Sequence, residues 1–184
     1  MAANHISYLD PLAHGLFLWR RGRHPRYFAK QELFEVPILG MALRGMAQIP
    51  VRRGVGDRRP IELGEEALAR GEAIIVYPEG TVTRNPDSTP MEGKSGLVRL
   101  ALASDLPVTP IAIWGAQHVW QKSGKGDLKF GRPIWLKAGE PVDVSAYADR
   151  AEDLDALREA TAVVMNELRA LVLDMRERYP KRWS

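Results

Sequence analysis

An uninterrupted apolar run in the middle of the chain, residues 73–77, most constrains the fold. Its sequence, Ala-Ile-Ile-Val-Tyr, predicts a strand that is buried on both faces. A helical pattern over residues 60–70, closed by Gly71, precedes this strand, and a strand-like segment at residues 47–51 precedes that helix. Strand, helix and strand in this order predict a βαβ unit with parallel strands.

Hydrophobic periodicity and turn residues place the other regular elements on both sides of this unit. They predict two further helices and three short strands: helices at residues 10–21 and 95–103, and strands at 27–29, 108–113 and 134–136. Helices that alternate with strands along a chain are typical of the α/β class.

Two further segments are expected to be helical. Residues 30–45 are interrupted by Pro37 and Gly40, which predicts two short helical pieces with Gly45 as the C-terminal cap. Near the carboxyl terminus, apolar residues recur every three or four positions from about residue 149 to 178. This stripe predicts one long amphipathic helix that packs on the rest of the fold.

The composition is that of a globular protein. The chain has 184 residues, of which 45% are hydrophobic and 27% charged, so we expect a single domain spanning residues 1–184. Because there is no cysteine, disulfides, a zinc-thiolate site and an acyl group carried on a cysteine thiol are excluded. Any acyl or phosphoryl chemistry must therefore avoid a cysteine nucleophile.

Positive charge is concentrated in the first third of the chain. Residues 1–60 hold ten Lys or Arg against four Asp or Glu, although the net charge of the whole chain is only +3. Such an excess suits an anionic membrane, nucleic acid or a phosphorylated substrate. Nucleic acid is not expected, because the basic residues are not interleaved with a recognisable reading motif. No run approaches the roughly 18 apolar residues of a spanning helix, so we expect a soluble or peripheral protein.

His5 and Asp10 are the candidate catalytic residues. They lie in the stretch Asn-His-Ile-Ser-Tyr-Leu-Asp, where an imidazole can take a proton from a substrate hydroxyl while the carboxylate orients the ring. A structural alternative is that Asp10 is only the N-cap of a helix whose first residue is Pro11. Ser7 is expected to support the turn through a hydrogen bond rather than to act as a nucleophile.

Arginines and a lysine elsewhere in the chain are candidates for binding a phosphate group. Arg52 and Arg53 follow the strand at residues 47–51, and two guanidinium groups at a strand end can hold a phosphate bidentately. Lys94 lies in a Gly-Lys-Ser triplet similar to a nucleotide-binding loop. Ser88 stands where the full nucleotide-binding pattern requires glycine, so an NTPase is not expected.

A Pro-Glu-Gly-Thr turn, with Glu79, Gly80 and Thr81, directly follows the central buried strand. Ligands of open α/β sheets bind beyond the carboxyl ends of the strands, so these three residues are candidates for substrate contacts. Gly80 permits close approach of the backbone. A purely structural alternative for Glu79 is a carboxylate that stabilises the turn.

Four blocks of the sequence resemble the motifs of the glycerolipid acyltransferase family, which includes 1-acyl-glycerol-3-phosphate acyltransferases. The resemblance covers roughly residues 3–136. The first block is residues 4–10, the third is Tyr-Pro-Glu-Gly-Thr at 77–81, and the fourth is Pro-Val-Thr-Pro-Ile at 107–111. The second combines Lys-Gln-Glu-Leu at 30–33 with the following residues: Pro37, Gly40, Gly45, Ile49, Val51 and Arg52.

The resemblance implies a single αβα domain with a mixed, largely parallel central sheet and an acyl-chain groove beside the motifs. It implies that a fatty acyl group is moved from an acyl thioester, on coenzyme A or acyl carrier protein, to a hydroxyl of a lysophospholipid. The acceptor it implies first is 1-acyl-sn-glycerol-3-phosphate, which would give phosphatidate; another lysolipid or a glycolipid is the alternative. The donor is a substrate, and no cofactor is expected. Peripheral attachment to the cytoplasmic face of an anionic membrane is also implied.

The resemblance assigns roles to the candidate residues. His5, oriented by Asp10, is the general base for direct attack on the thioester, and backbone N–H groups stabilise the oxyanion. Glu79, with Gly80 and Thr81, helps to position the acceptor. The family commonly has arginine at the next position, where this chain has Val82. The residues that can replace that arginine are Arg52, Arg53, Arg84 and Lys94.

Two rival functions fit the same residues less fully. A metal-dependent hydrolase is the first, because Asp10 and His14 have i, i+4 spacing on one helical face and His5 can join them. The second is a non-catalytic module that binds anionic membranes through the basic first third.

Overall fold

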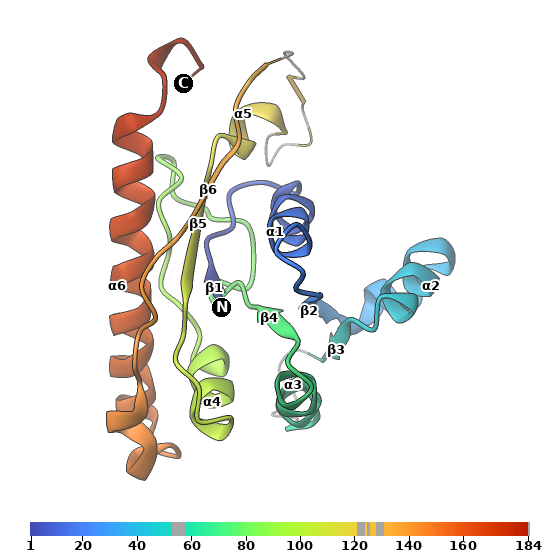
Figure 1. The fold of residues 1–184 in the computed structure, drawn as a ribbon, viewed down its shortest axis with the longest axis vertical. Helices are drawn as coiled ribbons and strands as arrows, with labels where there is room; N and C mark the ends of the chain where they lie inside the picture. Colours follow the sequence, from blue (N-terminus) through green and yellow to red (C-terminus); the bar gives the residue numbers. More distant parts are fainter. Residues whose placement is uncertain (53–57, 121–123, 125, 128–130, 184) are drawn as a thin grey trace.

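A computed structural model describes residues 1–52, 58–120, 124, 126–127 and 131–183 of the chain (Figure 1). Its strands are β1 (Ala2–Ala3), β2 (Pro25–Lys30), β3 (Ile49–Val51), β4 (Ala73–Ile75), β5 (Pro110–Trp114) and β6 (Trp135–Ala138). Its α-helices are α1 (Asp10–Trp19), α2 (Pro37–Gly45), α3 (Arg59–Ala69), α4 (Gly96–Ala103), α5 (Ala116–Val119) and α6 (Leu154–Arg178). Three 3-10 helices are η1 (Gln31–Phe34), η2 (Ser145–Arg150) and η3 (Lys181–Trp183).

The six strands form two three-stranded sheets that meet at β1. One sheet has the order β3-β2-β4 and is parallel throughout, whereas the other has the order β1-β5-β6 with β6 antiparallel to β5. A parallel bridge between Ala2 and Val76 links β1 to the end of β4. The predicted α/β fold with mixed, largely parallel strands is therefore confirmed. Because β1 touches both sheets, the residues that follow it emerge at the junction between them.

Helix α6 covers one side of β5 and β6 along most of their length (Figure 1). The apolar stripe predicted from the sequence is the buried face of this helix, with fully buried side chains at Leu157, Val164, Leu168 and Val172. Burying each such side chain contributes about 1.5–3 kcal/mol, so this contact is a main source of stability. Helix α1 lies on the other side of the sheet, which leaves the chain after β1 between the two helices (Figure 1).

The predicted start of the long helix, at about residue 149, was wrong. Residues up to Arg150 belong to η2, and α6 begins only at Leu154. The reason is local, because the carboxylate of Asp153 accepts hydrogen bonds from Asp155 N at 2.9 Å and Ala156 N at 3.5 Å and so caps the helix there.

The segment at residues 30–45 forms two helical pieces as predicted, but its glycines act differently from the expectation. Gly40 lies inside α2, where a Cβ would come within 2.0 Å of the Phe34 carbonyl oxygen, so it permits η1 and α2 to pack closely. Gly45 is the last helical residue and not a left-handed cap. Ala47 takes the positive φ value, 48°, that the reversal of the chain requires.

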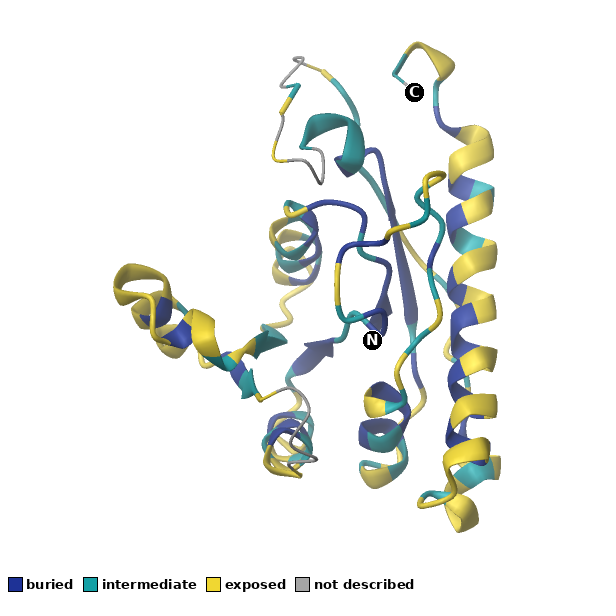
Figure 2. Cartoon of the chain, turned by 180° about the vertical axis from the view of Figure 1, so that it is seen from behind, coloured by how far each residue is buried: buried dark blue, intermediate teal, exposed yellow. Residues whose placement is uncertain are grey.

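Helix α2 extends away from the sheets, and its surface is largely exposed (Figures 1 and 2). Arg26 of β2 ties the end of this helix to the core. Its guanidinium group donates to the carbonyl oxygens of Met46 and Ala47 at 2.6 and 2.8 Å, and it forms a bidentate pair with Glu72 at 2.5 and 2.9 Å. Both side chains of this pair are 16% exposed, so their pairing is shielded from water.

We predict that Glu72→Gln lowers the free energy of unfolding by about 1.5–3 kcal/mol at pH 7, because a charge-assisted bidentate pair is lost. The Arg26 guanidinium lowers the pKa of Glu72 to about 2. A lowered carboxyl pKa contributes stability above the unfolded value of 4.5 and loses it as the pH falls towards 2. The difference between wild type and variant should therefore shrink between pH 4.5 and pH 2 in urea denaturation.

The matched control is Glu62→Gln, which breaks an exposed pair with Arg59. Exposed pairs contribute about 1 kcal/mol or less, so this variant should unfold nearly as the wild type does. Equal losses in the two variants would contradict a special role for the Arg26 to Glu72 pair.

Candidate active site

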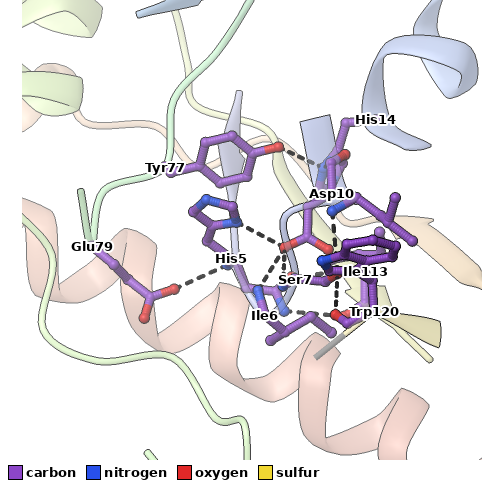
Figure 3. Close-up of polar contacts among 11 residues, drawn as sticks. His5, Ile6, Ser7, Asp10, His14, Tyr77, Glu79, Ile113 and Trp120 are labelled. Atoms are coloured by element: carbon purple, nitrogen blue, oxygen red, sulfur yellow. Dashed lines mark hydrogen bonds and ion pairs between the residues drawn. The ribbon is translucent and has the colours of Figure 1, made fainter. Parts of the chain in front are cut away.

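The carboxylate of Asp10 forms hydrogen bonds to several residues of the loop that connects β1 to α1 (Figure 3). Its Oδ2 atom lies 2.8 Å from Nδ1 of His5 and accepts the backbone N–H groups of Ile6 at 2.6 Å and Ser7 at 2.8 Å. Asp10 is fully buried, whereas the His5 side chain is 14% exposed. Nδ1 of His5 therefore carries the proton and donates it to the carboxylate, and Nε2 is left with a free lone pair.

The alternative prediction, that Asp10 is the N-cap of the helix, was wrong by one residue. Leu9 is the N-cap and has no side-chain capping bond, while Asp10 and Pro11 are the first two helical residues. The carboxylate turns back to the loop rather than forward along the helix. One side chain thus shapes the start of α1 and orients His5.

Two other polar residues of this loop are held rigidly. The buried Asn4 side chain exchanges hydrogen bonds with the backbone of Ile113 in β5, at 3.0 Å to its carbonyl oxygen and 2.8 Å from its N–H. The Ser7 hydroxyl donates to the Trp120 carbonyl at 2.7 Å and accepts the Leu9 N–H at 3.1 Å. Ser7 supports the turn as expected, and both sides of its hydroxyl are already engaged.

The loop after β4 is fastened to the same site through Glu79. One of its carboxylate oxygens accepts the backbone N–H of His5 at 3.1 Å, and the other accepts the N–H of Met91 at 2.9 Å. Glu79 is 5% exposed, and burial raises its pKa. Gly80 has φ of 70°, and a Cβ there would lie 3.3 Å from Nζ of Lys94. The first and third blocks of the sequence are therefore joined at the backbone of His5.

A large groove of about 2240 Å³ opens beside His5. Its apolar walls come from α1, β2 and the end of α2, with Leu12, Leu16 and Leu43 among the lining residues. His5 lines the groove, and so do the candidate binding residues Gly80, Thr81, Arg52 and Lys94.

The other candidates for phosphate binding are placed differently. Val82 is 4% exposed, and Arg84 is exposed but does not line the groove. Arg53 lies outside the described residues. Of the four suggested replacements for an arginine after Thr81, the structure brings Arg52 and Lys94 to the groove that holds His5.

Tyr77 was not among the predicted site residues, and His14 was named only as a ligand of the rival metal site, yet both lie at the centre of this site. The Tyr77 ring stacks on His5, and its hydroxyl is 3.0 Å from Nδ1 of His14 (Figure 3). The signal in the sequence was that Tyr77 opens the third block, directly before the Pro-Glu-Gly-Thr turn. The contact depends on the pairing of β1 beside β4, which periodicity along one segment does not reveal.

The metal-site hypothesis joined His14 to His5 and the Asp10 carboxylate. In the structure, Nδ1 of His14 faces the Asp10 carbonyl oxygen at 2.9 Å and the Tyr77 hydroxyl. Within the described part of the chain, no three His, Cys, Asp or Glu side chains are arranged to hold a metal ion.

The sequence is similar to a family of known enzymes. The family model described as Acyltransferase matches residues 1–114. A 1-acyl-sn-glycerol-3-phosphate acyltransferase of Bacillus subtilis is 28% identical over 170 residues, covering 91% of this chain and 79% of that protein. A chloroplastic enzyme of the same name from Brassica napus is 26% identical over 168 residues, covering 89% of this chain but only 45% of the relative. The lyso-ornithine lipid O-acyltransferase of Pseudomonas aeruginosa is 32% identical over 113 residues, which are 60% of this chain and 41% of that enzyme.

The crystal structure of the 1-acyl-sn-glycerophosphate (LPA) acyltransferase from Thermotoga maritima has a similar fold. It superposes with a TM-score of 0.65 and 30% identity, covering 98% of this chain and 67% of that protein. This chain spans less than half the length of several curated relatives that it matches, including the Brassica enzyme. The family model covers more than half of the chain, and the fold agrees with it: the chain belongs to the acyltransferase family.

Proposed function

We propose that this protein transfers a fatty acyl group from an acyl thioester to the hydroxyl of a lysophospholipid. The observation that carries the proposal is the contact between His5 and the buried Asp10 at the edge of a large apolar groove. Such a pair orients a base, and such a groove suits a long acyl chain. Coenzyme A or acyl carrier protein is the proposed carrier of the acyl group.

The reaction needs one base and no covalent enzyme intermediate. Nε2 of His5 takes the proton from the acceptor hydroxyl as its oxygen attacks the thioester carbonyl. The tetrahedral intermediate then collapses, the carbon–sulfur bond breaks, and the imidazolium returns the proton to the departing thiolate. Asp10 holds the tautomer and faces the positive charge that His5 carries between the two steps. Ser7 takes no part as a nucleophile, because its hydroxyl binds the backbone on both sides.

The proposed acceptor is 1-acyl-sn-glycerol-3-phosphate, and the product is then phosphatidate. Arg52 and Lys94 line the groove with His5, and both are exposed to a ligand entering it. These cations favour a phosphate headgroup. The alternative acceptor is suggested by the Pseudomonas relative, whose name specifies a lyso-ornithine lipid. Of these two acceptors, the phosphate-bearing lysolipid gains more binding energy from two nearby cations than the lyso-ornithine lipid does.

We predict that His5→Ala lowers kcat by about a thousandfold with little change in the acceptor KM, because general base catalysis is lost. Arg52→Ala should raise the acceptor KM about tenfold and leave kcat nearly unchanged, because it removes ground-state binding of phosphate. The assay follows thiol release from a long-chain acyl-coenzyme A with lysophosphatidate in detergent micelles.

Arg84→Ala is the matched control, since Arg84 is an exposed arginine outside the groove lining. It should keep both constants, and circular dichroism should show that all three variants are folded. A folded His5→Ala protein with wild-type kcat would refute the assignment of the base.

We also propose that the protein attaches peripherally to the cytoplasmic face of an anionic membrane. The described residues include no helix that is both long and apolar enough to cross a bilayer. Instead, α1 exposes Leu12, Leu16 and Trp19 on one face, while α2 exposes Ile38 (80%) and Met41 (65%). Basic residues follow α1 directly: Arg20, Arg21 and Arg23. An exposed apolar surface beside cations is suited to anionic headgroups and the acyl region beneath them.

We predict that the double variant Ile38→Asp, Met41→Asp weakens binding to phosphatidylglycerol-containing vesicles at least about tenfold in sedimentation assays, because two apolar side chains become charged. The matched control is Val163→Asp, Leu173→Asp, which alters two exposed apolar residues of α6 instead. Unchanged binding of the α2 variant, or an equal loss in the α6 variant, would rule out α2 as the membrane contact.

A further inference from the structure

Tyr77 stands between the two histidines of the site. Its ring lies against the imidazole of His5, with centroids 4.3 Å apart and an interplanar angle of 25°. Its hydroxyl points the other way, to Nδ1 of His14 at 3.0 Å (Figure 3). The ring of Tyr77 therefore covers one face of His5, while Asp10 contacts the edge of the same imidazole.

His14 contacts the hydroxyl end of Tyr77. It is fully buried in α1, and its Nδ1 lies 2.9 Å from the Asp10 carbonyl oxygen. Because a carbonyl oxygen can only accept, Nδ1 of His14 carries a proton and shares it between Asp10 O and the Tyr77 hydroxyl oxygen. Burial lowers the pKa of His14 to about 4, so it is neutral near pH 7. Burial raises the pKa of Tyr77, so its hydroxyl stays uncharged beside the site.

The Tyr77 ring lies next to the positive charge that His5 acquires during the proposed acyl transfer. His5 becomes an imidazolium when it takes the acceptor proton, and the face of an aromatic ring attracts a cation. The titratable groups that face His5 are Asp10 from α1, Glu79 from the loop after β4, Tyr77 itself and the neutral His14. Tyr77 is the one among these that covers the imidazole face.

We propose that Tyr77 is a positioning residue for His5, whose aromatic ring fixes the plane of the imidazole and stabilises its protonated form. This inference rests on the proposed function for its effect on rate. The stacking itself is independent of that function. Removing the aromatic face should slow proton abstraction without weakening the binding of lysolipid.

The test compares Tyr77→Phe, which keeps the ring, with Tyr77→Met and Tyr77→Leu, which fill the space without one. We expect Tyr77→Met to lower kcat about tenfold at constant acceptor KM, since a desolvated cation–π contact is worth about this factor. The acidic limb of its pH profile of kcat/KM should move to lower pH, because protonated His5 loses a favourable partner. Tyr77→Phe should restore kcat to within about threefold of wild type and return the limb to its wild-type position.

Tyr179→Met is the matched control. Tyr179 also stacks on a histidine, His118, with ring centroids 5.8 Å apart and an interplanar angle of 23°, and its hydroxyl donates to the Pro133 carbonyl oxygen at 2.8 Å. Tyr179 is buried and follows the end of α6, and it does not line the groove beside His5. Its substitution should lower thermal stability and leave the pH profile in place.

A second measurement, an NMR titration of the His5 ring in wild type, Tyr77→Phe and Tyr77→Met, needs no substrate. We expect its midpoint to move to lower pH in Tyr77→Met and to stay in place in Tyr77→Phe. If the wild type transferred no acyl group, the proposed function would fail while this titration still decided the role of Tyr77. The proposal is overturned if folded Tyr77→Met keeps its titration midpoint, or if Tyr77→Met and Tyr179→Met change kcat alike. If Tyr77→Met does not fold, Tyr77→Leu replaces it in the same comparison. If neither variant folds, Tyr77→Phe decides: a folded Tyr77→Phe protein whose His5 midpoint differs from that of the wild type also overturns the proposal.

Discussion

The buried carboxylate of Asp10 is the interaction on which the rest of the site depends. A desolvated carboxylate is costly unless hydrogen-bond donors surround it, and here one oxygen takes a ring nitrogen and two backbone N–H groups. Those donors belong to three consecutive residues, His5, Ile6 and Ser7. The carboxylate therefore closes the loop after β1 and sets the imidazole orientation with the same set of bonds.

The fold supplies the support that this loop needs. Strand β1 is only two residues long, but it lies between β4 and β5, so the loop leaves the sheet at the junction of its two halves. Asn4 binds β5 on one side, and Glu79 binds the His5 backbone on the other. Segments that are far apart in sequence thus converge on His5. The groove beside it is bounded by α1, β2 and α2, and Arg26 of β2 holds the end of α2 through two backbone carbonyl oxygens while it pairs with Glu72.

The sequence was informative wherever a local pattern decides the structure. The buried run at residues 73–77, the stripe of α6 and the spacing of His5 and Asp10 all predicted features that the structure contains. It was less informative where a single residue departs from the pattern, as Asp153 does by capping the start of α6 and Ala47 does by taking the positive φ after α2. The contact of Tyr77 with both histidines arises from strand order, which no single segment encodes. For Glu79, the sequence offered two roles, and its observed bonds to backbone N–H groups supply the structural one.

The most direct test of the account is a single-turnover measurement of thiol release from a long-chain acyl-coenzyme A, with and without lysophosphatidate. Direct attack by an acceptor activated at His5 predicts no release without the acceptor. With the acceptor present, it predicts one thiol for each acyl group transferred. A burst of thiol in the absence of any acceptor would show that the acyl group first moves to the enzyme, and it would contradict the central claim.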